Sequence, residues 1–456
     1  MSKEKNIIMT KGNPYKLLLR FALPLMLGNV FQQMYTLVDT MVVGKGVGVD
    51  ALAAVGAADW LNWMCFGMVG GFAQGFSIPV AQEFGAGHKE KLRKNIGNII
   101  CVAAVCSVVM AVIFQLVALP VLSLLKTPEE ILPMALLYVR IFFAGLPIAM
   151  AYNVLAAILR AMGDGKTPLY AMIVASVINI GLDVLFVMVF SFGIAGAAVA
   201  TLIAEAISTV YCYIALRRMN GMKLGKEEFT PEKQCVTHLL KLSLPLAFQN
   251  VVICVGGMIV QFVVNGFGVL FIAGYTATNK LYGLLEMAAV SFGYAISTYV
   301  GQNVGAGEYK RLKSGHIAGV IVSLATSFVI TAAMLIFGKI FIGMFLSGTP
   351  EEIATAGAVA WTYLLFMSLA LPALYLLYVY RSALQGMGNT LIPMISGILE
   401  FIMRTGMVLG LTRLLGSNGI FWAEISAWIG AAILLGISYY VIMTKKNFKK
   451  EEANSQ

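Results

Sequence analysis

The sequence carries little charge and few residues suited to disulfide or metal chemistry. Asp, Glu, Lys and Arg make up 12% of its 456 residues, whereas soluble domains are about a quarter charged. A soluble protein of this size would need more polar surface to cover its core. The six cysteines form no C-x-x-C pair and the three histidines form no H-E-x-x-H pattern, so we expect neither disulfides nor a histidine-bound metal.

Sequence signatures of enzymes, nucleotide binding and secretion are also missing. Gly165-Lys166-Thr167 resembles the end of a P-loop, but Arg160 stands where the first glycine of that loop is required. The chain shows no Ser/His or metal constellation, and its first residues have no apolar stretch followed by a small-residue cleavage site. We therefore predict that it is not an enzyme, binds no cofactor and has no cleaved signal peptide.

Long apolar stretches dominate the rest of the sequence. Hydrophobic residues make up 59% of the chain, and its mean hydropathy is +0.84. A helix that crosses a bilayer needs about 20 mainly apolar residues. Twelve segments meet this requirement, near 15–43, 51–84, 95–122, 131–159, 168–191, 194–217, 238–264, 270–303, 316–344, 352–384, 391–413 and 418–443. We therefore predict an all-α integral membrane protein with twelve transmembrane helices, three of which contain a proline, at Pro24, Pro147 and Pro245.

Basic residues indicate how these helices are oriented. Most of the 32 lysines and arginines fall near the two termini and in alternate loops, and short loops rich in these residues stay in the cytoplasm. We therefore predict a multi-pass protein of the plasma (inner) membrane with both termini cytoplasmic. The net charge of +10 follows from this bias and from attraction to anionic membrane lipid, so it predicts no nucleic-acid partner.

The chain repeats itself with a shift of about 220 residues. The motif Leu-Pro-Leu at 23–25 recurs at 244–246, and Gln-x-x-Gly-Ala-Gly at 82–87 recurs at 302–307. Each half holds six predicted spans, an even number, so the halves share one orientation and are related by an axis along the membrane normal. Transporters of this design bind substrate between the halves and rock to expose it to either side.

The repeat predicts the domain organisation. Two pseudo-symmetric six-helix lobes are expected at 1–218 and 237–456. A polar segment at 219–236 is expected to join them on the cytoplasmic side.

A polar stripe in the first predicted span contains the first candidate for chemistry. The spacing of Asn29, Gln32, Thr36 and Asp39 keeps the four side chains on one helical face. Burying an ionisable side chain in hydrocarbon is costly, so Asp39 is a functional candidate by default.

The fifth predicted span contains the second candidate acid. Asp183 lies one helical turn after Asn179, so the two share a face. Thr201 in the sixth span and Asn153 in the fourth add further oxygen ligands or hydrogen-bond partners. Two carboxylates close together in a poorly hydrated pocket cannot both stay charged cheaply, so the pair can take up H⁺ or be neutralised by Na⁺.

The second half of the chain keeps neither acid. Asp39 aligns near Val260 and Gln261, and Asp183 aligns with Val408. If the acids served only the scaffold, the second half should keep similar residues, so we infer that the first lobe holds the ion-coupling site. A polar clamp between helices is the alternative. The candidate cation-coupling residues are Asp39, Asp183, Asn179, Asn153 and Thr201.

Other charged residues within the spans are ambiguous. Glu400 and Arg404 are four residues apart, close enough to pair on one helical face, and either a structural ion pair or a substrate contact would explain them. The remaining ambiguous residues are Glu205 and Arg140 in the first half and Lys280, Glu286 and Glu424 in the second.

Several of these stretches together carry a resemblance to a known family. They are Pro24 with Gln-Gln-x-Tyr-x-x-x-Asp at 32–39, the two Gly-Ala-Gly loops, Leu-Arg-Ala-Met-Gly-Asp at 159–164, and Asn-x-x-x-Asp at 179–183. Over about residues 12–445 the sequence resembles the multidrug and toxic compound extrusion (MATE) transporters. The acids in spans one and five make it most similar to the DinF-like branch of that family.

The resemblance implies an antiporter that exports amphipathic, often cationic, small molecules in exchange for H⁺ or Na⁺. It implies that Asp39, Asn179, Asp183 and Thr201 match the first-lobe cation site, where they are candidate Na⁺ ligands, with Asn153 as a further member. It places Gln32 and Tyr35 at the substrate cavity, together with Asn29 of the same stripe, and associates Pro24 with bending of the first helix.

Rival functions are a lipid-linked oligosaccharide flippase of the same superfamily, an intramembrane enzyme and a passive channel. The flippase is the main alternative, although such proteins usually have a more cationic cavity and often extra spans. We expect membrane lipid as the surroundings and no obligate protein partner.

Overall fold

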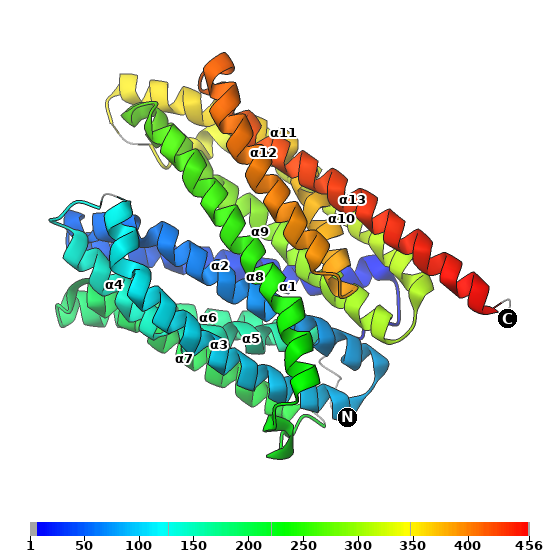
Figure 1. Cartoon of the computed structure of the whole chain (residues 1–456). Coiled ribbons are helices and arrows are strands. Elements are labelled where there is room, and N and C mark those ends of the chain that lie inside the picture. Colours follow the sequence, from blue (N-terminus) through cyan, green and yellow to red (C-terminus); the bar gives the residue numbers. More distant parts are fainter. Residues whose placement is uncertain (1–6, 126, 220, 347, 455–456) are drawn as a thin grey trace. The chain divides into compact units, whose positions relative to one another are not determined.

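A computed structural model describes residues 7–125, 127–219, 221–346 and 348–454 of the chain, and no strand occurs among them. The first half contains α1 (Pro14–Gly46), α2 (Val49–Ala86), α3 (Lys89–Leu124), α4 (Leu132–Ala144), α5 (Leu146–Ala161), α6 (Lys166–Asp183), the π-helix η1 (Val184–Val189), α7 (Gly193–Arg218) and the 3₁₀-helix η2 (Glu227–Phe229). The second half contains α8 (Lys233–Asn265), α9 (Val269–Gly305), α10 (Tyr309–Gly343), α11 (Pro350–Gly386), α12 (Leu391–Leu415) and α13 (Asn418–Asn454) (Figure 1).

The lengths and composition of these helices fit a membrane protein, as predicted. Nine of the described helices are long and apolar enough to span a bilayer, and the bent pair α4 and α5 makes a tenth candidate. The helices α1 and α9 are just as long, at 33 and 37 residues, but polar and charged side chains such as Asp39 and Glu286 interrupt their apolar stretches. With α4 and α5 taken as one span, the described α-helices number twelve, which confirms the predicted fold class.

Prolines inside the helices are more numerous than predicted. Pro24 and Pro245 lie inside α1 and α8 as predicted, but Pro79, Pro120 and Pro372 lie inside α2, α3 and α11. The prediction of three in-span prolines was therefore incomplete. Pro147 lies in the first turn of α5 at a 50° bend from α4, where a residue without an N–H loses no intrahelical hydrogen bond.

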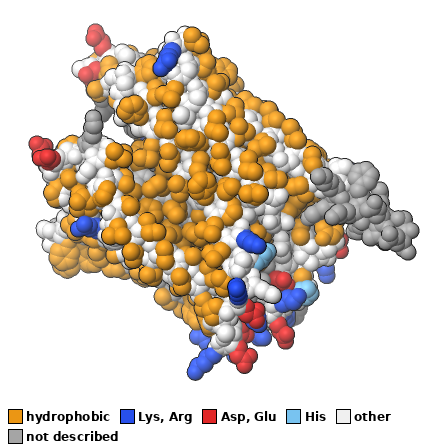
Figure 2. Space-filling model, in the orientation of Figure 1, with side chains coloured by type: hydrophobic (Ala, Val, Ile, Leu, Met, Phe, Trp, Pro, Cys, Tyr) orange, Lys and Arg blue, Asp and Glu red, His pale blue; other side chains and the backbone are white. Residues whose placement is uncertain are grey.

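The outer surface of the helices is apolar, as a lipid-facing surface must be. On α3, Leu116 is 72% exposed and Val105 is 64% exposed. Hydrophobic side chains cover most of the face shown in Figure 2. Side chains like these would be unfavourable in water, whereas lipid solvates them.

By packing, the chain forms two compact units. Unit 1 comprises Met1–Lys11, Arg20–Val251 and Gly301–Glu308, and unit 2 comprises Gly12–Leu19, Val252–Val300 and Tyr309–Gln456. The helices α1, α8 and α9 contribute to both units, so the units do not follow the sequence repeat residue for residue. The lobes at 1–218 and 237–456 and the linker at 219–236 stay predictions.

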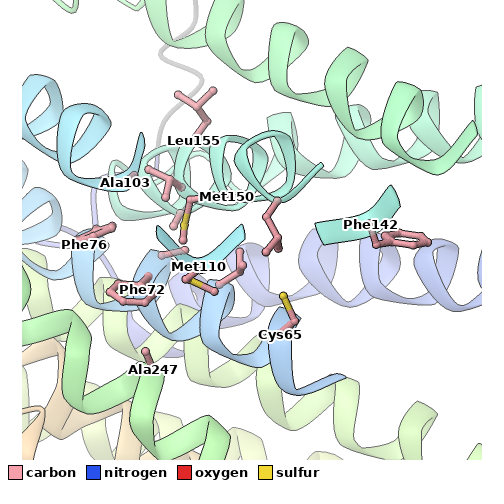
Figure 3. Packing of buried hydrophobic residues seen from close by; sticks show 14 of the residues in the cluster. Cys65, Phe72, Phe76, Ala103, Met110, Phe142, Met150, Leu155 and Ala247 are labelled. Atoms are coloured by element: carbon pink, nitrogen blue, oxygen red, sulfur yellow. The ribbon is translucent and has the colours of Figure 1, made fainter. Parts of the chain in front are cut away.

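The core of unit 1 is built from α2, α3, α4, α5 and neighbouring helices. Phe72 and Phe76 of α2 lie near Met110 of α3 and Met150 of α5 (Figure 3). The α2 and α8 helices pack closely at Gly71, where an added Cβ atom would collide with the α8 backbone. Only glycine permits this approach of two helices.

The repeated Gln-x-x-Gly-Ala-Gly motif has two physical explanations within unit 1. Its last glycine, Gly87 or Gly307, adopts a left-handed conformation, with φ of +74° and +71° respectively, where α2 and α9 end. Its first glycine lies against the other copy of the motif: a Cβ on Gly85 would collide with the Gln302 carbonyl, and one on Gly305 with that of Gln82.

The segment after α7 is fixed against the first turns of α3 within unit 1. The backbone of Glu228 lies where any Cβ on Gly97 would collide with it, and the Arg93 guanidinium pairs with the Glu228 carboxylate at 3.3 Å. The Asn98 side-chain oxygen accepts a hydrogen bond from the backbone N–H of Glu232 at 2.9 Å. This packing places Phe229 of η2 beside the lipid-facing helices of unit 1.

Candidate functional site

The α6 and α7 helices of unit 1 bring three of the predicted side chains into contact. The Asn179 amide donates hydrogen bonds to Asp183 Oδ1 at 3.5 Å and to Thr201 Oγ1 at 3.4 Å. The Thr201 hydroxyl donates to the backbone carbonyl of Ala197 at 3.1 Å. Asn179 and Asp183 are 1% and 0% exposed, so this contact is fully removed from solvent and lipid.

Asp39 of α1 completes the cluster. Its carboxyl group lies within hydrogen-bonding reach of the Asp183 carboxyl group, and the two interact electrostatically. Two carboxyl groups can share a hydrogen bond only if they hold a proton between them. We name Asp39, Asn179, Asp183 and Thr201 the acid cluster.

Three oxygen atoms of the acid cluster are buried and accept no hydrogen bond from an amide, hydroxyl or other permanent donor of the described residues. They are Asp39 Oδ1, Asn179 Oδ1 and Asp183 Oδ2. Leaving a buried acceptor unpaired costs about 1–3 kcal/mol, so unpaired acceptors at one point need a reason. All three oxygens are hard ligands that suit H⁺ or an alkali cation.

The backbone changes form directly after Asp183. The α6 helix ends at this residue and the chain continues as the π-helix η1, over Val184–Val189. Short π-helical segments occur frequently at functional sites, because they re-aim side chains at the cost of a poorer hydrogen-bond pattern. Nothing in the residue pattern predicted this segment.

Asn153 is held differently from the acid cluster. Its side-chain amide donates to the backbone carbonyl of Ala149, one turn earlier in α5, at 2.9 Å. None of the hydrogen bonds found among the described residues links it to Asp183. The structure therefore joins four of the five predicted coupling residues.

The predicted cavity residues follow the α1 face that carries Asp39. Tyr35 is half-buried, lies within hydrogen-bonding reach of Gln32 and interacts electrostatically with Asp39. Gln32 is exposed and Asn29 is half-buried. Pro24 lies inside α1, 15 positions before Asp39 in the sequence.

Glu205, which the sequence left ambiguous, belongs to the same region of unit 1. It lies one turn after Thr201 on α7 and interacts electrostatically with Tyr35 and Tyr152. Its Oε2 atom is buried and has no hydrogen-bond partner among the described residues. A sequence signal existed, since a glutamate four residues from Thr201 shares its helical face.

The chemistry of the acid cluster differs from that of a transition-metal site. Within the described residues, no group of three or more His, Cys, Asp or Glu side chains is placed to hold a metal ion. The acid cluster offers two carboxylates, one amide and one hydroxyl. Oxygen groups of this kind are hard ligands, whereas transition metals favour imidazole and thiolate ligands.

In unit 2, three acids within the helices are paired. Arg404 Nη2 lies 2.8 Å from Glu424 Oε2, Glu400 forms an ion pair with Arg381, and the Tyr378 hydroxyl donates to Glu286 Oε1 at 2.8 Å. Glu400 and Arg404 interact electrostatically, but the ion pairs found among the described residues do not include one between them. Each residue pairs with another helix, because tertiary neighbours compete with the local i to i+4 contact. Lys280 is exposed.

Comparison with known proteins agrees with this architecture. The MatE family model matches residues 24–185 and again residues 245–410, which agrees with the internal repeat. The chain is 29% identical to the probable multidrug resistance protein YoeA of Bacillus subtilis (strain 168), over 98% of each chain.

Solved structures show the same fold. A structure described as MATE in the bent conformation superposes with a TM-score of 0.89 at 21% identity, covering 99% of this chain and 100% of the other. One described as MATE in the straight conformation gives 0.88 at 21% identity, covering 97% and 99%. The chain therefore belongs to the MatE family of multidrug efflux transporters, which are multi-pass integral membrane proteins and not enzymes.

Proposed function

We propose that the protein is a cation-coupled antiporter that exports amphipathic, often cationic, small molecules from the cytoplasm in exchange for H⁺ or Na⁺. The observation that carries this proposal is the acid cluster with its three unpaired, buried oxygen atoms. An intramembrane acid is costly, and a pair of acids in contact is more costly still unless an ion neutralises it.

The acid cluster acts as an exchange site in this proposal. Asp39 and Asp183 hold the charge, while the Asn179 amide and the Thr201 hydroxyl orient Asp183 and supply further oxygens. When the cluster loses its ion, its negative charge attracts a cationic substrate. When an ion binds again, that attraction is lost and the substrate is released.

The membrane potential drives this exchange when the entering ions carry one positive charge more than the departing substrate. One elementary charge that crosses about 100 mV gains about 2.3 kcal/mol. At about 1.4 kcal/mol for each factor of ten, this sustains a substrate gradient of roughly 50-fold.

The remaining predicted residues take supporting roles. Gln32, Tyr35 and Asn29 contact substrate beside Asp39, and Asn153 contributes to the coupling region from α5. Pro24 lets α1 change its bend between states, since an internal proline removes one backbone hydrogen bond. The existence of MATE structures described as bent and straight is consistent with such a change.

Relatives favour export over the flippase alternative, since YoeA is named a multidrug resistance protein. We place the protein in the plasma (inner) membrane with both termini cytoplasmic, without a prosthetic cofactor, an obligate protein partner or a nucleic-acid partner. Residues 1–6, with Lys3 and Lys5, lie outside the described residues, as do the side chains beyond residue 444. Assignment to the DinF-like branch also stays a prediction.

Transport in proteoliposomes with separately imposed pH and Na⁺ gradients tests the proposal. Export of a cationic dye should follow one of the two gradients in the wild type. Asp39→Asn should insert and fold but should not respond to either gradient. Dye movement that ignores both gradients in the wild type would contradict antiport.

A further inference from the structure

A cavity in unit 1 is lined by none of the residues of the acid cluster. It has a volume of about 390 Å³ and is lined by five residues of α3, five of α5, Tyr213 of α7 and Phe229 of η2. Figure 3 shows Ala103, Met150 and Leu155 of this lining, side by side at the contact of α3 with α5. We name it the α3–α5 groove.

The α3–α5 groove opens toward lipid. Val108 on its α3 side is 55% exposed, and Tyr213 and Phe229 are 39% and 37% exposed. Val105, which neighbours the lining on α3, is 64% exposed. Hydrocarbon is the solvent that meets side chains of this kind in a membrane.

The lining offers almost nothing to a polar ligand. Ser107 donates its hydroxyl hydrogen bond to the carbonyl of Ala104 within α3, and apart from this residue and the Tyr213 hydroxyl, the lining side chains are apolar. A flexible apolar chain therefore fits the groove, while a polar or charged molecule would lose its hydration without compensation.

A positive charge lies beside this apolar lining. Arg217 follows Tyr213 by one turn of α7, and its guanidinium carbon lies 5.9 Å from the centre of the Tyr213 ring. Arg217 is exposed and takes part in none of the ion pairs found among the described residues. Glu228 of η2 is paired with Arg93 at 3.3 Å.

The cover of the groove is well anchored. The Cys101 thiol contacts the backbone carbonyl of Phe229 at 3.4 Å, and the preceding residue packs against Gly97. Phe229 is thus held over the cavity by α3 itself. The segment that connects the two halves of the chain therefore forms one wall of a lipid-facing cavity.

We propose that the α3–α5 groove is a specific binding site for an anionic phospholipid. One acyl chain lies in the groove between α3 and α5 beneath Phe229, and the phosphate group pairs with Arg217. An apolar cavity beside an unpaired guanidinium is complementary to this class of lipid, which the cytoplasmic leaflet supplies. The inference does not depend on the proposed antiport, because the groove and the acid cluster share no residue.

Native mass spectrometry of the full-length protein with added phosphatidylglycerol or phosphatidylcholine tests the site. Val108 lines the groove, whereas Val112 lies one turn further along α3, outside the lining, and is equally exposed at 55%. Val108→Trp should fill the groove and weaken phosphatidylglycerol binding by more than about tenfold, because an indole excludes several methylene groups. Val112→Trp should bind this lipid as the wild type does.

A second pair of variants tests the headgroup contact without disturbing packing. Arg217→Gln should lower the preference for phosphatidylglycerol over phosphatidylcholine by about fivefold, the effect of one arginine near an anionic surface. Arg218→Gln should change it less, since Arg217 is the arginine that lies over the Tyr213 ring. Thermal unfolding of the four variants identifies any that fail to fold.

Two results would overturn the proposal. Equal lipid retention by Val108→Trp and Val112→Trp would mean that no lipid occupies the groove. Unchanged lipid binding with a selective loss of dye export in Val108→Trp would mean that the groove is a route for substrate instead.

Discussion

The two units treat the acids within their helices in opposite ways. In unit 2, Glu286, Glu400 and Glu424 each have a partner, from a tyrosine hydroxyl or an arginine on another helix. In unit 1, Asp39, Asp183 and Glu205 each keep a buried oxygen without a partner among the described residues. A paired acid fixes helices to one another, whereas an unpaired acid keeps capacity for a mobile ion or a substrate.

This contrast explains why the positions at which the two halves differ are informative about function. Both halves keep the Gly-Ala-Gly motif, which ends a helix and permits close backbone contact. Only the first half keeps the aspartates at positions 39 and 183, and the buried acid oxygens that lack a permanent donor among the described residues all lie in that half. The shared residues build the scaffold, and we propose that the differing ones carry the ion exchange.

Removal of either aspartate is expected to have the largest effect. Asp39→Asn and Asp183→Asn should each lower ion-driven export to the background rate. In either variant the remaining acid has no second carboxyl group with which to hold a proton or a cation. Export is measured in proteoliposomes, and size-exclusion chromatography confirms folding.

The double variant sharpens this result. If the two acids form one site, Asp39→Asn with Asp183→Asn should export no less than either single variant. Losses that add independently would show that the two acids serve separate sites.

Breaking an ion pair in unit 2 should lower the stability of the protein and leave ion coupling unchanged. Arg381→Met leaves Glu400 buried without its ion pair and should lower the free energy of unfolding by about 3–5 kcal/mol. Thermal unfolding measures the loss, and Arg381→Met combined with Glu400→Leu should recover most of it. If Arg381→Met lost ion coupling at a temperature where it is still folded, the acids of unit 2 would also take part in ion exchange, and the two units would not differ as proposed.

Glu205 offers an intermediate test. Glu205→Gln should weaken binding of a monocationic dye by about tenfold, as expected for loss of a charged partner, and leave an uncharged substrate unaffected. Glu286→Gln is the matched control, since the Tyr378 hydroxyl already satisfies that acid. If Glu205→Gln lost affinity equally for the monocationic dye and for the uncharged substrate, Glu205 would have a structural role instead.

Thr201 should show the smallest effect. Thr201→Val removes the acceptor of one Asn179 hydrogen bond and should weaken coupling-ion affinity by about threefold. Thr209 lies two turns further along α7 and bonds only the backbone of its own helix, so Thr209→Val is the control. An identical ion dependence for both variants would remove Thr201 from the acid cluster.

Helical periodicity in the sequence predicts which residues share one face of a helix. The stripe that ends at Asp39 and the pair of Asn179 with Asp183 follow from helical geometry, and the structure brings the two acids together. The spans themselves follow from hydropathy, because lipid leaves the outer faces apolar.

Features that depend on contacts between different helices could not be predicted from the sequence. Glu400 has both a local partner and a tertiary one, and only packing decides in favour of Arg381. The π-helix after Asp183 and the covering of the α3–α5 groove by Phe229 likewise depend on packing between helices, which residue spacing does not reveal.

Ion release on substrate binding tests the central claim most directly. Purified protein in weakly buffered detergent solution receives a cationic dye while a pH indicator and a Na⁺ electrode record the solution. We predict that the wild type releases H⁺ or Na⁺ as the dye binds, and that Asp39→Asn and Asp183→Asn release neither. Equal release by the wild type and both variants would contradict the assignment of ion coupling to the acid cluster.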